Sequence, residues 1–511
     1  MAYSIIPGEE LQHSAAEEEE KVDDIAFDLL DELVTRKPFL EESRAFLEGD
    51  PLGNEYEPDE DQQFNGMEQL RDMSRNNYAK LIVDATTDRL GILGFRTSGG
   101  SSEFGDDEAM RLFVRDGMDS RAQEAMGLAC GYRTSYLAVD PLSKRQQVIP
   151  PTNASVINDI SGEPIAAISV HRDRALGRQV LRVYTRGVNE MTGQAEGPVQ
   201  MFVATKEDKR LRYDNGLALK LTRYDSEVEL NGNVRQGWVW WKQQNIDLTR
   251  IPITPLTNRD GRNEFELHQS VINRLNHMIY QRVIIATMQA FRQRAVKGNF
   301  PETDPKTGRK IDYEDMFEAG PARLWLLPQD ADLWESNPPQ FQDILNSVKE
   351  DRQDLASSTY TPISYFSDSV NNSAEGANLQ RENYMSKIGD RRRRFGSGWK
   401  RHISIAFEAN GMEDRAAEDM IEVIWAPANI LSLNERTQAF ATMRQNGVSY
   451  KTALREGLGM TPTEAKRAIQ EQSQEILSNN LTQAVQQATP LSKVQKVERA
   501  NSQPQTEGDN Q

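Results

Sequence analysis

Cysteine is almost absent from this chain, which has one cysteine among 511 residues. Cys130 alone cannot form an intramolecular disulfide, and a single cysteine fits a reducing cytoplasm and a place in a core. No apolar run approaches the ~20 residues that a membrane-spanning helix needs. The acidic N-terminal residues lack the pattern of a signal peptide. The sequence therefore predicts a folded, soluble protein made in the cytosol.

The common catalytic motifs are also absent. The sequence contains no GxxxxGK[ST], HExxH or GxSxG motif and no paired CxxC. The chain thus lacks the phosphate-binding loop that an ATP-driven motor would need, so any such motor would be a separate chain. The five histidines are scattered and fit packing or surface positions better than ligand positions; they are His13, His171, His268, His277 and His402. We expect no catalytic residue, no metal site and no cofactor.

A basic charge balance is missing as well. The chain has 60 lysines and arginines against 78 acidic residues, a net charge of -18. Broad wrapping of nucleic acid calls for a basic surface, so any contact with DNA must be local or deliberately weak. A hydrophobic content of 37% over 511 residues is enough for two to four domains with true cores.

The first half of the chain mixes helical and strand periodicity. Apolar spacing predicts an amphipathic helix through Ile25–Leu33 that ends before Pro38, and further helices over Met67–Leu90 and Asp107–Leu128. From Tyr132 to Trp241 the apolar period falls to two, in short β-rich runs separated by turn residues. This region predicts an antiparallel sheet packed on the preceding helices, and the predicted fold class is α+β.

A helical hairpin follows. Asn263 with Glu266 forms a capping pattern, and the segment Asn263–Lys297 continues as a helix without glycine or proline. No acidic residue lies between Glu266 and Glu302, so we expect the basic residues of this helix to meet a partner surface. A Pro-rich excursion, Asn299–Pro339, separates it from a second helix at Gln340–Ser357. The excursion would form the tip of the hairpin.

The stretch from Thr359 to Gly411 contains the sharpest change in sequence pattern, from a polar loop to a long helix. A helix over Ser373–Ala409, capped by Asn372, would be roughly 55 Å long. Its glycines predict a bend near the four arginines 391–394. These arginines form either a solvated face or a contact with an acidic neighbour or a phosphate backbone.

Shorter elements complete the prediction. Ile251–Asn258 is expected to be an extended connector where the β region stops. Ile421–Pro427 is predicted to be a strand that rejoins the earlier sheet. Three short helices are expected at Asn434–Arg444, Ser449–Glu456 and Thr461–Leu477, followed by a polar, disordered tail over Leu481–Gln511.

Three stretches carry a resemblance to a known family. They are NNYAKLIVDATTDRLGILGF (Asn76–Phe95), IPITPLTNRDGR (Ile251–Arg262) and Thr361–Trp399, in which a Thr-Pro start, an Asn-x-Ser-x-x-Gly-Ala step and a Phe-Gly-x-x-Trp end occur together. The chain resembles the portal proteins of tailed phages, of the family found in long-tailed phages and common in phages of actinobacteria. The resemblance covers roughly Gln62 to Leu477.

The resemblance implies a portal-type fold, with long stem and wing helices, an antiparallel β region and a helical C-terminal crown. Its parts would be an acidic, helical N-terminal segment (1–50), the wing (51–260), stem helix 1 (261–298), the clip (299–339), stem helix 2 (340–358), the tunnel loop (359–372), a long kinked helix with a wing strand (373–431), the crown (432–478) and a disordered polar tail (479–511).

The function that the resemblance implies is a dodecameric ring at a unique capsid vertex. Such a ring is a channel for DNA packaging and ejection and a docking platform for the terminase motor and the head-tail connector. The implied partners are other copies of the chain, double-stranded DNA, the terminase large subunit, the major capsid and scaffold proteins and a head-tail adaptor, with no membrane. The implied location is the virion, after assembly in the host cytoplasm. The alternatives are a cytosolic scaffold or adaptor and a hydrolase without a recognisable motif.

The resemblance also implies roles for individual residues. Tyr360, Ser364, Tyr365, Phe366 and Ser367 would line the DNA channel in the tunnel loop, although the aromatic residues could instead pack between loops. In the clip, Arg309, Lys310, Arg323 and Trp325 would dock partners. The basic residues could instead contact DNA or form solvated surface, and the tryptophan could belong to the clip core or to a subunit interface. In the stem, the subunit interface would contain Leu275, Ile279, Arg282 and Val283.

Overall fold

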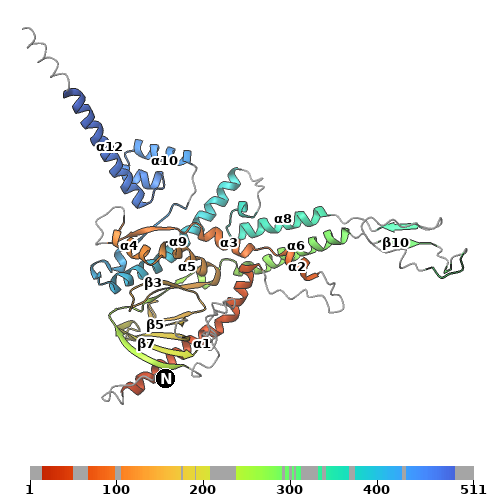
Figure 1. Cartoon of the computed structure of the whole chain (residues 1–511), viewed down its shortest axis with the longest axis horizontal. Helices are drawn as coiled ribbons and strands as arrows, with labels where there is room; N and C mark the ends of the chain where they lie inside the picture. Colours follow the sequence, from red (N-terminus) through yellow and green to blue (C-terminus); the bar gives the residue numbers. More distant parts are fainter. Residues whose placement is uncertain are drawn as a thin grey trace, which may run out of the picture. The chain divides into compact units, whose positions relative to one another are not determined.

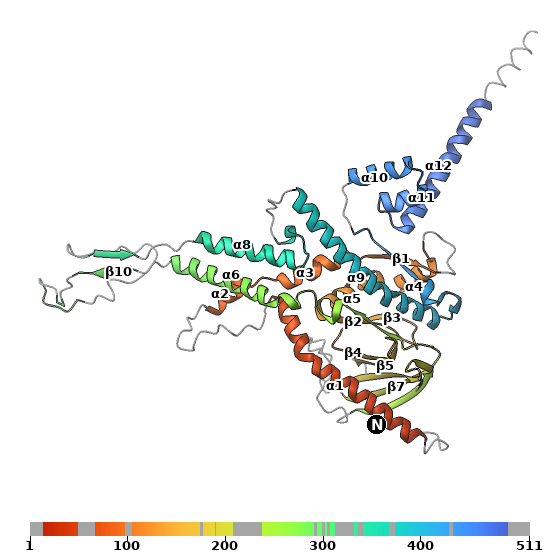
Figure 2. The same cartoon turned by 180° about the vertical axis from the view of Figure 1, so that it is seen from behind.

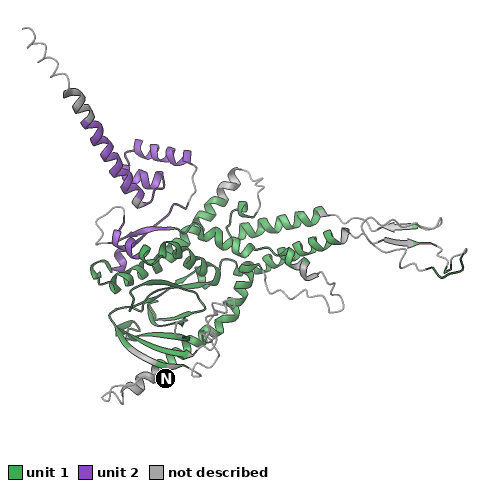
Figure 3. Cartoon of the chain, viewed as in Figure 1, with its two compact units in different colours: residues 1–91, 113–416 green, residues 92–112, 417–511 purple. Residues whose placement is uncertain are grey.

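The computed structural model describes most of the chain, namely residues 14–49, 67–97, 105–173, 177–189, 191–207, 238–290, 294–298, 302–303, 307–311, 332–335, 341–366, 374–428 and 433–488. The chain divides into two compact units, coloured separately in Figure 3. Unit 1 comprises Met1–Gly91 and Phe113–Ala416, and unit 2 comprises Ile92–Leu112 and Ala417–Gln511. The predicted α+β class is confirmed by long helices beside antiparallel sheets.

The first helix, α1 (Ser14–Glu48), is longer than predicted, because it continues through Pro38. Proline inside a helix removes one backbone hydrogen bond and normally breaks the helix. Burial on both sides offsets this cost: Leu29 before the proline is fully buried, and Leu40 and Phe46 after it are 3% and 5% exposed. The prediction that the helix ends before Pro38 is wrong for this reason.

Two further predicted helices are each split in two. Met67–Leu90 contains α2 (Met67–Ser74) and α3 (Tyr78–Thr87). Asn77 starts α3, because its side-chain oxygen accepts a hydrogen bond from the Lys80 amide at 3.3 Å. The second helical region contains α4 (Asp107–Arg115) and α5 (Met118–Tyr132), separated at Gly117, whose φ of 69° is left-handed.

The β region of unit 1 is antiparallel, as predicted, but it forms two sheets and not one. A five-stranded sheet runs in chain order through β4 (Ala154–Asn158), β5 (Pro164–Asp173), β6 (Arg178–Val188), β7 (Ala195–Glu207) and β8 (Val239–Ile246). A three-stranded sheet has the order β3 (Gln146–Ile149), β2 (Thr134–Val139), β9 (Ile253–Thr257). The segment expected to be a connector where the β region stops is therefore strand β9, which pairs with β2.

The five-stranded sheet is covered on both faces, and alternate residues of each strand serve the two faces. On β6, Leu181 and Val183 join a core with Leu29 and Leu30 of α1. Their neighbours, such as Val180, join a second core with the three-stranded sheet and the end of the long helix α9 (Ala374–Ala409). Figure 1 shows α1 along one side of this sheet.

The long helix α9 (Ala374–Ala409) agrees with the prediction over 36 residues. Its predicted apolar stripe is buried, including Tyr384, Ile388, Phe395, Trp399 and Ile403. It ends in a Schellman motif, in which Gly411 has a φ of 73° and the Met412 amide donates to the Phe407 carbonyl at 2.9 Å. The predicted N-cap, Asn372, lies outside the described residues.

The predicted helical hairpin is present. After a 3-10 turn, η5 (Glu266–His268), helix α6 (Gln269–Ala290) lies beside α8 (Phe341–Ser358), and both views show the pair (Figures 1 and 2). The first helix ends earlier than predicted, because Arg294–Lys297 is strand β10. This strand pairs with β11 (Asp332–Glu335), so interstrand hydrogen bonds replace helical ones at the tip.

Unit 2 contains a small sheet that the sequence prediction placed elsewhere. Strand β12 (Glu422–Trp425) pairs with β1 (Ile92–Arg96), so the expectation that Ile421–Pro427 rejoins the earlier sheet is wrong. The predicted C-terminal helices are α10 (Leu433–Gln445), α11 (Tyr450–Thr452) with a following π turn, and α12 (Pro462–Ala488). Helix α12 extends into the tail that was expected to be disordered; residues 489–511 lie outside the described residues. Among the helices of the described chain, none is long and apolar enough to cross a membrane.

Gly398 permits a close approach between α9 and β9. A Cβ at this position would lie 2.4 Å from Leu256 Cδ2 and 3.3 Å from the Pro255 carbonyl oxygen. At Gly389 of the same helix, the nearest atom to an added Cβ belongs to Arg393, at 3.7 Å. The two glycines therefore differ in the space around them.

We expect Gly398→Ala to lower the free energy of unfolding by about 1–3 kcal/mol, because Leu256 must move within a filled core. Gly389→Ala should raise it by up to about 1 kcal/mol through helix propensity. Urea unfolding of both variants tests this. Equal effects at the two glycines would contradict the close approach.

Candidate functional site

The turn after α8 is closed by a Schellman motif with an unusual residue at its left-handed position. The Tyr360 amide donates to the Ser357 carbonyl at 3.3 Å and the Thr361 amide to the Ala356 carbonyl at 2.9 Å. Tyr360 has a φ of 51°. This conformation costs a residue with a Cβ roughly 1–2 kcal/mol, and the end of α9 uses glycine in the equivalent place. The Tyr360 side chain is 53% exposed.

The residues on either side of Tyr360 are buried and bonded. The Thr359 hydroxyl donates to the Leu355 carbonyl at 2.7 Å and lies 3.0 Å from the Thr361 hydroxyl. The Thr359 carbonyl accepts a hydrogen bond from Lys387 Nζ of α9 at 2.9 Å. The end of α8 is thus held by a charged donor from another helix.

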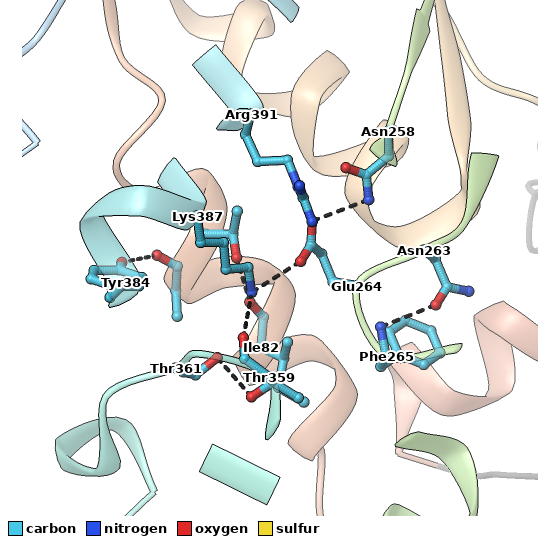
Figure 4. A network of polar contacts seen from close by, with 12 residues as sticks. Ile82, Asn258, Asn263, Glu264, Phe265, Thr359, Thr361, Tyr384, Lys387 and Arg391 are labelled. Carbon is cyan, nitrogen blue, oxygen red and sulfur yellow. Dashed lines mark hydrogen bonds and ion pairs between the residues drawn. The ribbon is translucent and has the colours of Figure 1, made fainter. Parts of the chain in front are cut away.

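Lys387 belongs to a buried ion triad with Glu264 and Arg391, shown in Figure 4. Lys387 Nζ lies 2.9 Å from Glu264 Oε2, and Arg391 Nε donates to Glu264 Oε1 at 2.6 Å. Asn258 Nδ2 also donates to this carboxylate, at 3.1 Å. All three charged residues of the triad are less than 9% exposed. Each buried charge therefore has a partner of opposite sign.

The triad fixes the charge state of Glu264. Burial alone would raise the pKa of this carboxyl, but the charges of Lys387 and Arg391 and their hydrogen bonds lower it to about 2. The Glu264 amide donates to the Cys130 carbonyl at 2.9 Å, and burial raises the pKa of the Cys130 thiol. Cys130 is a buried thiol, as the sequence predicted, and its raised pKa disfavours the reactive thiolate.

The triad and the hydrogen bond from Lys387 to Thr359 together join three elements. Glu264 lies just before η5 and so at the start of the α6 segment, while Lys387 and Arg391 lie one turn apart on α9. Through the Thr359 carbonyl, Lys387 also holds the end of α8. Both arms of the hairpin are thereby fastened to α9 at their base.

Four of the five predicted channel residues are described, and they separate into a packed pair and an exposed pair. Phe366 is 8% exposed and stacks on Tyr78 of α3, with ring centroids 6.0 Å apart. The Tyr365 hydroxyl accepts a hydrogen bond from Arg89 at 3.3 Å, and its ring lies 6.5 Å from that of Tyr384.

Tyr360 and Ser364, in contrast, are exposed. The turn therefore presents Tyr360 and Ser364 to solvent, whereas the other two aromatic residues anchor it. The fifth predicted channel residue, Ser367, lies outside the described residues.

The arginines 391–394 divide between the two alternatives left open by the sequence. Besides Arg391, which pairs with Glu264, Arg394 has an acidic neighbour, because Asp390 Oδ2 accepts from Arg394 Nε at 3.1 Å. The Arg393 side chain is 75% exposed, with its nearest carboxylate at 3.9 Å. Within the subunit, Arg391 and Arg394 thus have acidic neighbours, Arg392 donates to the Arg89 carbonyl, and Arg393 is largely exposed.

The remaining predicted residues are placed as follows. Arg309 and Lys310 are exposed, while Arg323 and Trp325 lie outside the described residues. Leu275 is fully buried and Ile279 is 2% exposed, so both already pack within the subunit. Of the four predicted stem-interface residues, Arg282 and Val283 are half-buried and present surface.

Sequence reasoning missed Glu264 and Lys387. A signal for Lys387 and Arg391 was available, because they follow Tyr384 by three and seven positions and so lie on its buried stripe. His402 is fully buried, and burial lowers its pKa to about 3, so this histidine is neutral and a packing residue as predicted. Over the described residues, no three histidine, cysteine or acidic side chains group as metal ligands.

Lys387→Met should lower the free energy of unfolding by about 3 kcal/mol, because it removes one of the two cations that offset the burial of Glu264 and also the donor to the Thr359 carbonyl. Arg393→Met, on the exposed face of the same helix, is the matched control and should change it by less than about 0.5 kcal/mol. Urea unfolding measures both. A Lys387→Met variant as stable as the control would show that the triad contributes nothing.

The low pKa of Glu264 also predicts a pH dependence. The folded state lowers this pKa from 4.5 to about 2, so its contribution is complete above pH 4.5 and is lost as the pH falls toward 2. The difference in unfolding free energy between the wild type and Glu264→Gln should therefore narrow over this range, by on the order of 3 kcal/mol. A difference that stays constant from pH 6 to pH 3 would contradict the assignment.

Comparisons with known proteins give one family and a distant structural likeness. A family model described as "Phage portal protein, SPP1 Gp6-like" matches residues 52–478. The structure titled "Neck of empty GTA particle computed with C6 symmetry" is similar with a TM-score of 0.41 and 13% identity, over 75% of this chain and 88% of that chain. The corresponding neck of the native GTA particle, computed with C12 symmetry, has a TM-score of 0.39 and 12% identity over the same shares. No curated protein matches the sequence.

Proposed function

We propose that this chain, which belongs to the SPP1 Gp6-like family of phage portal proteins, assembles into a dodecameric ring at a unique vertex of the phage capsid. Portal proteins are structural components of phage particles, so the chain is a particle component and not an enzyme by family. The proposed ring is assembled in the host cytoplasm and remains in the virion. A cytosolic scaffold and a motif-free hydrolase have no supporting observation.

In this role the ring is a channel through which double-stranded DNA is packaged and later ejected. In this proposal the α6–α8 hairpin is the stem, and the segment between its two helices is the clip. The turn that begins at Thr359 is the tunnel loop. The clip, with Arg309 and Lys310 exposed, would dock the terminase large subunit and later the head-tail adaptor. The major capsid and scaffold proteins would contact the outside of the ring.

The observation that carries the channel assignment is the conformation of Tyr360. A tyrosine in a left-handed conformation costs stability, and such residues gather where function requires them. The buried neighbours Thr359, Thr361 and Phe366 hold the turn from both sides. An aromatic ring held outward on a fixed base fits a smooth wall beside moving DNA.

The net charge supports weak contact with this DNA. Each phosphate that a protein neutralises adds salt-dependent affinity, so a strongly basic channel would retain the duplex. The chain has a net charge of -18, and three basic residues at or close to the turn, Arg89, Lys387 and Arg391, make hydrogen bonds to protein groups. This arrangement favours sliding over binding.

Tyr360→Gly tests the assignment, because it separates stability from function. The variant should be more stable by about 1 kcal/mol, since glycine adopts the left-handed conformation without strain. It should still form rings but yield fewer DNA-filled heads when it replaces the wild type in phage assembly. Tyr360→Phe keeps the ring of the side chain and should behave as the wild type in both measurements.

Two outcomes would count against this account of Tyr360. Normal DNA filling by Tyr360→Gly would remove the side chain from the channel function. A Tyr360→Gly variant less stable than the wild type would mean that the turn does not hold a strained residue.

A further inference from the structure

The two helices of the hairpin carry opposite charge. Helix α6 has two arginines, Arg274 and Arg282, and no acidic residue. Helix α8 has four acidic residues, Asp343, Glu350, Asp351 and Asp354, against two basic ones. Charged residues make up 27% of the chain, so a helix without acidic residues beside a mainly acidic helix calls for an explanation. The explanation is packing either within the subunit or between subunits.

Packing within the subunit explains only part of it. Arg274 pairs with Asp351 across the hairpin at 2.6 Å. Asp343 is exposed and Arg282 is half-buried, and within the described part of the chain neither has an ion-pair partner. Among the described residues, one positive charge on α6 and one negative charge on α8 therefore have no partner of opposite sign.

Apolar side chains on both helices are incompletely covered as well. Val283, Ile284 and Ile285 follow one another on α6 and are all half-exposed. Because successive helical residues point about 100° apart, these three surround more than half of the helix. On α8, Leu345 is 41% exposed. The outer part of the hairpin thus exposes apolar side chains on the same two helices that carry the opposite charges.

The two unmatched charges lie at the same level of the hairpin. The Arg274–Asp351 pair fixes the register of the two antiparallel helices. Arg282 is eight residues after Arg274, and Asp343 is eight residues before Asp351, so each lies about 12 Å farther toward the tip. If copies of the chain are related by rotation about an axis parallel to the hairpin, equivalent residues stay at the same height along that axis. Such a rotation would bring Arg282 of one copy near Asp343 of the next.

We infer that the hairpin binds a second copy of this chain, with α6 of one subunit against α8 of the next and Arg282 facing the partner subunit's Asp343. Two different patches then meet, which is the heterologous contact that closes a ring. A two-fold contact of α6 with α6 would instead oppose like charges. This inference rests on the proposed ring and specifies which faces form it.

Charge reversal tests the pair. Arg282→Glu and Asp343→Lys each place like charges at the proposed contact, so each variant alone should need at least about tenfold more subunit for half-assembly, measured by light scattering. Lys349→Glu, an exposed charge reversal on α8, is the control and should assemble as the wild type. Urea unfolding of the unassembled subunits checks that all three variants fold.

Mixing the two defective variants distinguishes a contact between subunits from one within a subunit. In a ring of alternating Arg282→Glu and Asp343→Lys chains, every interface has opposite charges at positions 282 and 343. The equimolar mixture should therefore recover wild-type assembly. The matched control is the internal pair: Arg274→Glu and Asp351→Lys lose stability separately and regain it in one double variant, never by mixing.

The outcomes separate this inference from the proposed function. A wild type that forms no rings would overturn the proposed function. Wild-type rings together with normal assembly of Arg282→Glu, or with no recovery in the mixture, would overturn the α6–α8 contact and leave the ring intact. Recovery only in a single chain carrying both changes would show that the two residues pair within one subunit, which also overturns it.

Discussion

The buried carboxylate of Glu264 is the constraint on which the base of the hairpin depends. Removing a carboxylate from water costs several kcal/mol unless cations and hydrogen bonds replace the lost hydration. Lys387 and Arg391 supply them, and both lie on α9. Helix α9 must therefore stay against the start of the α6 segment. Lys387 extends the same constraint to the end of α8 through the Thr359 carbonyl.

This constraint explains why the turn after α8 has a fixed base and an exposed tip. Thr359 and Phe366 are buried on either side, whereas Tyr360 and Ser364 face solvent. In the proposed channel, such a turn would hold the Tyr360 side chain in a fixed position beside the moving duplex. Within the described residues, Arg282 and Asp343 of the hairpin have no ion-pair partner and Leu345 is exposed, which is what the proposed contact with a second copy of the chain would complete.

Local patterns in the sequence predicted the elements whose stability is local. The stripe of α9, the α6–α8 hairpin and the antiparallel β region are confirmed, because periodicity of 3.6 or 2 directly reports which face is buried. Contacts between distant segments overturned the rest. Burial carries α1 through Pro38, and β12 pairs with β1 more than three hundred residues earlier, which no local pattern encodes.

The candidate site was predictable to the same extent. The resemblance to portal proteins pointed to the turn and to Tyr360 and Ser364, and the structure adds that both are exposed. That they line a channel stays a prediction. The Glu264 triad was not predicted, because Arg391 and Glu264 are 127 residues apart and an isolated glutamate gives no sign of its partners. Only the place of Lys387 and Arg391 on a buried stripe could have indicated that they need a buried anion.

The central claim is that copies of this chain close into a ring with a channel, and the most direct measurement is the mass and symmetry of the purified protein. Light scattering gives the mass, and electron-microscope class averages viewed end-on give the symmetry. The account predicts particles of twelve subunits with a central hole wide enough for duplex DNA. A compact monomer at every salt and protein concentration would contradict it.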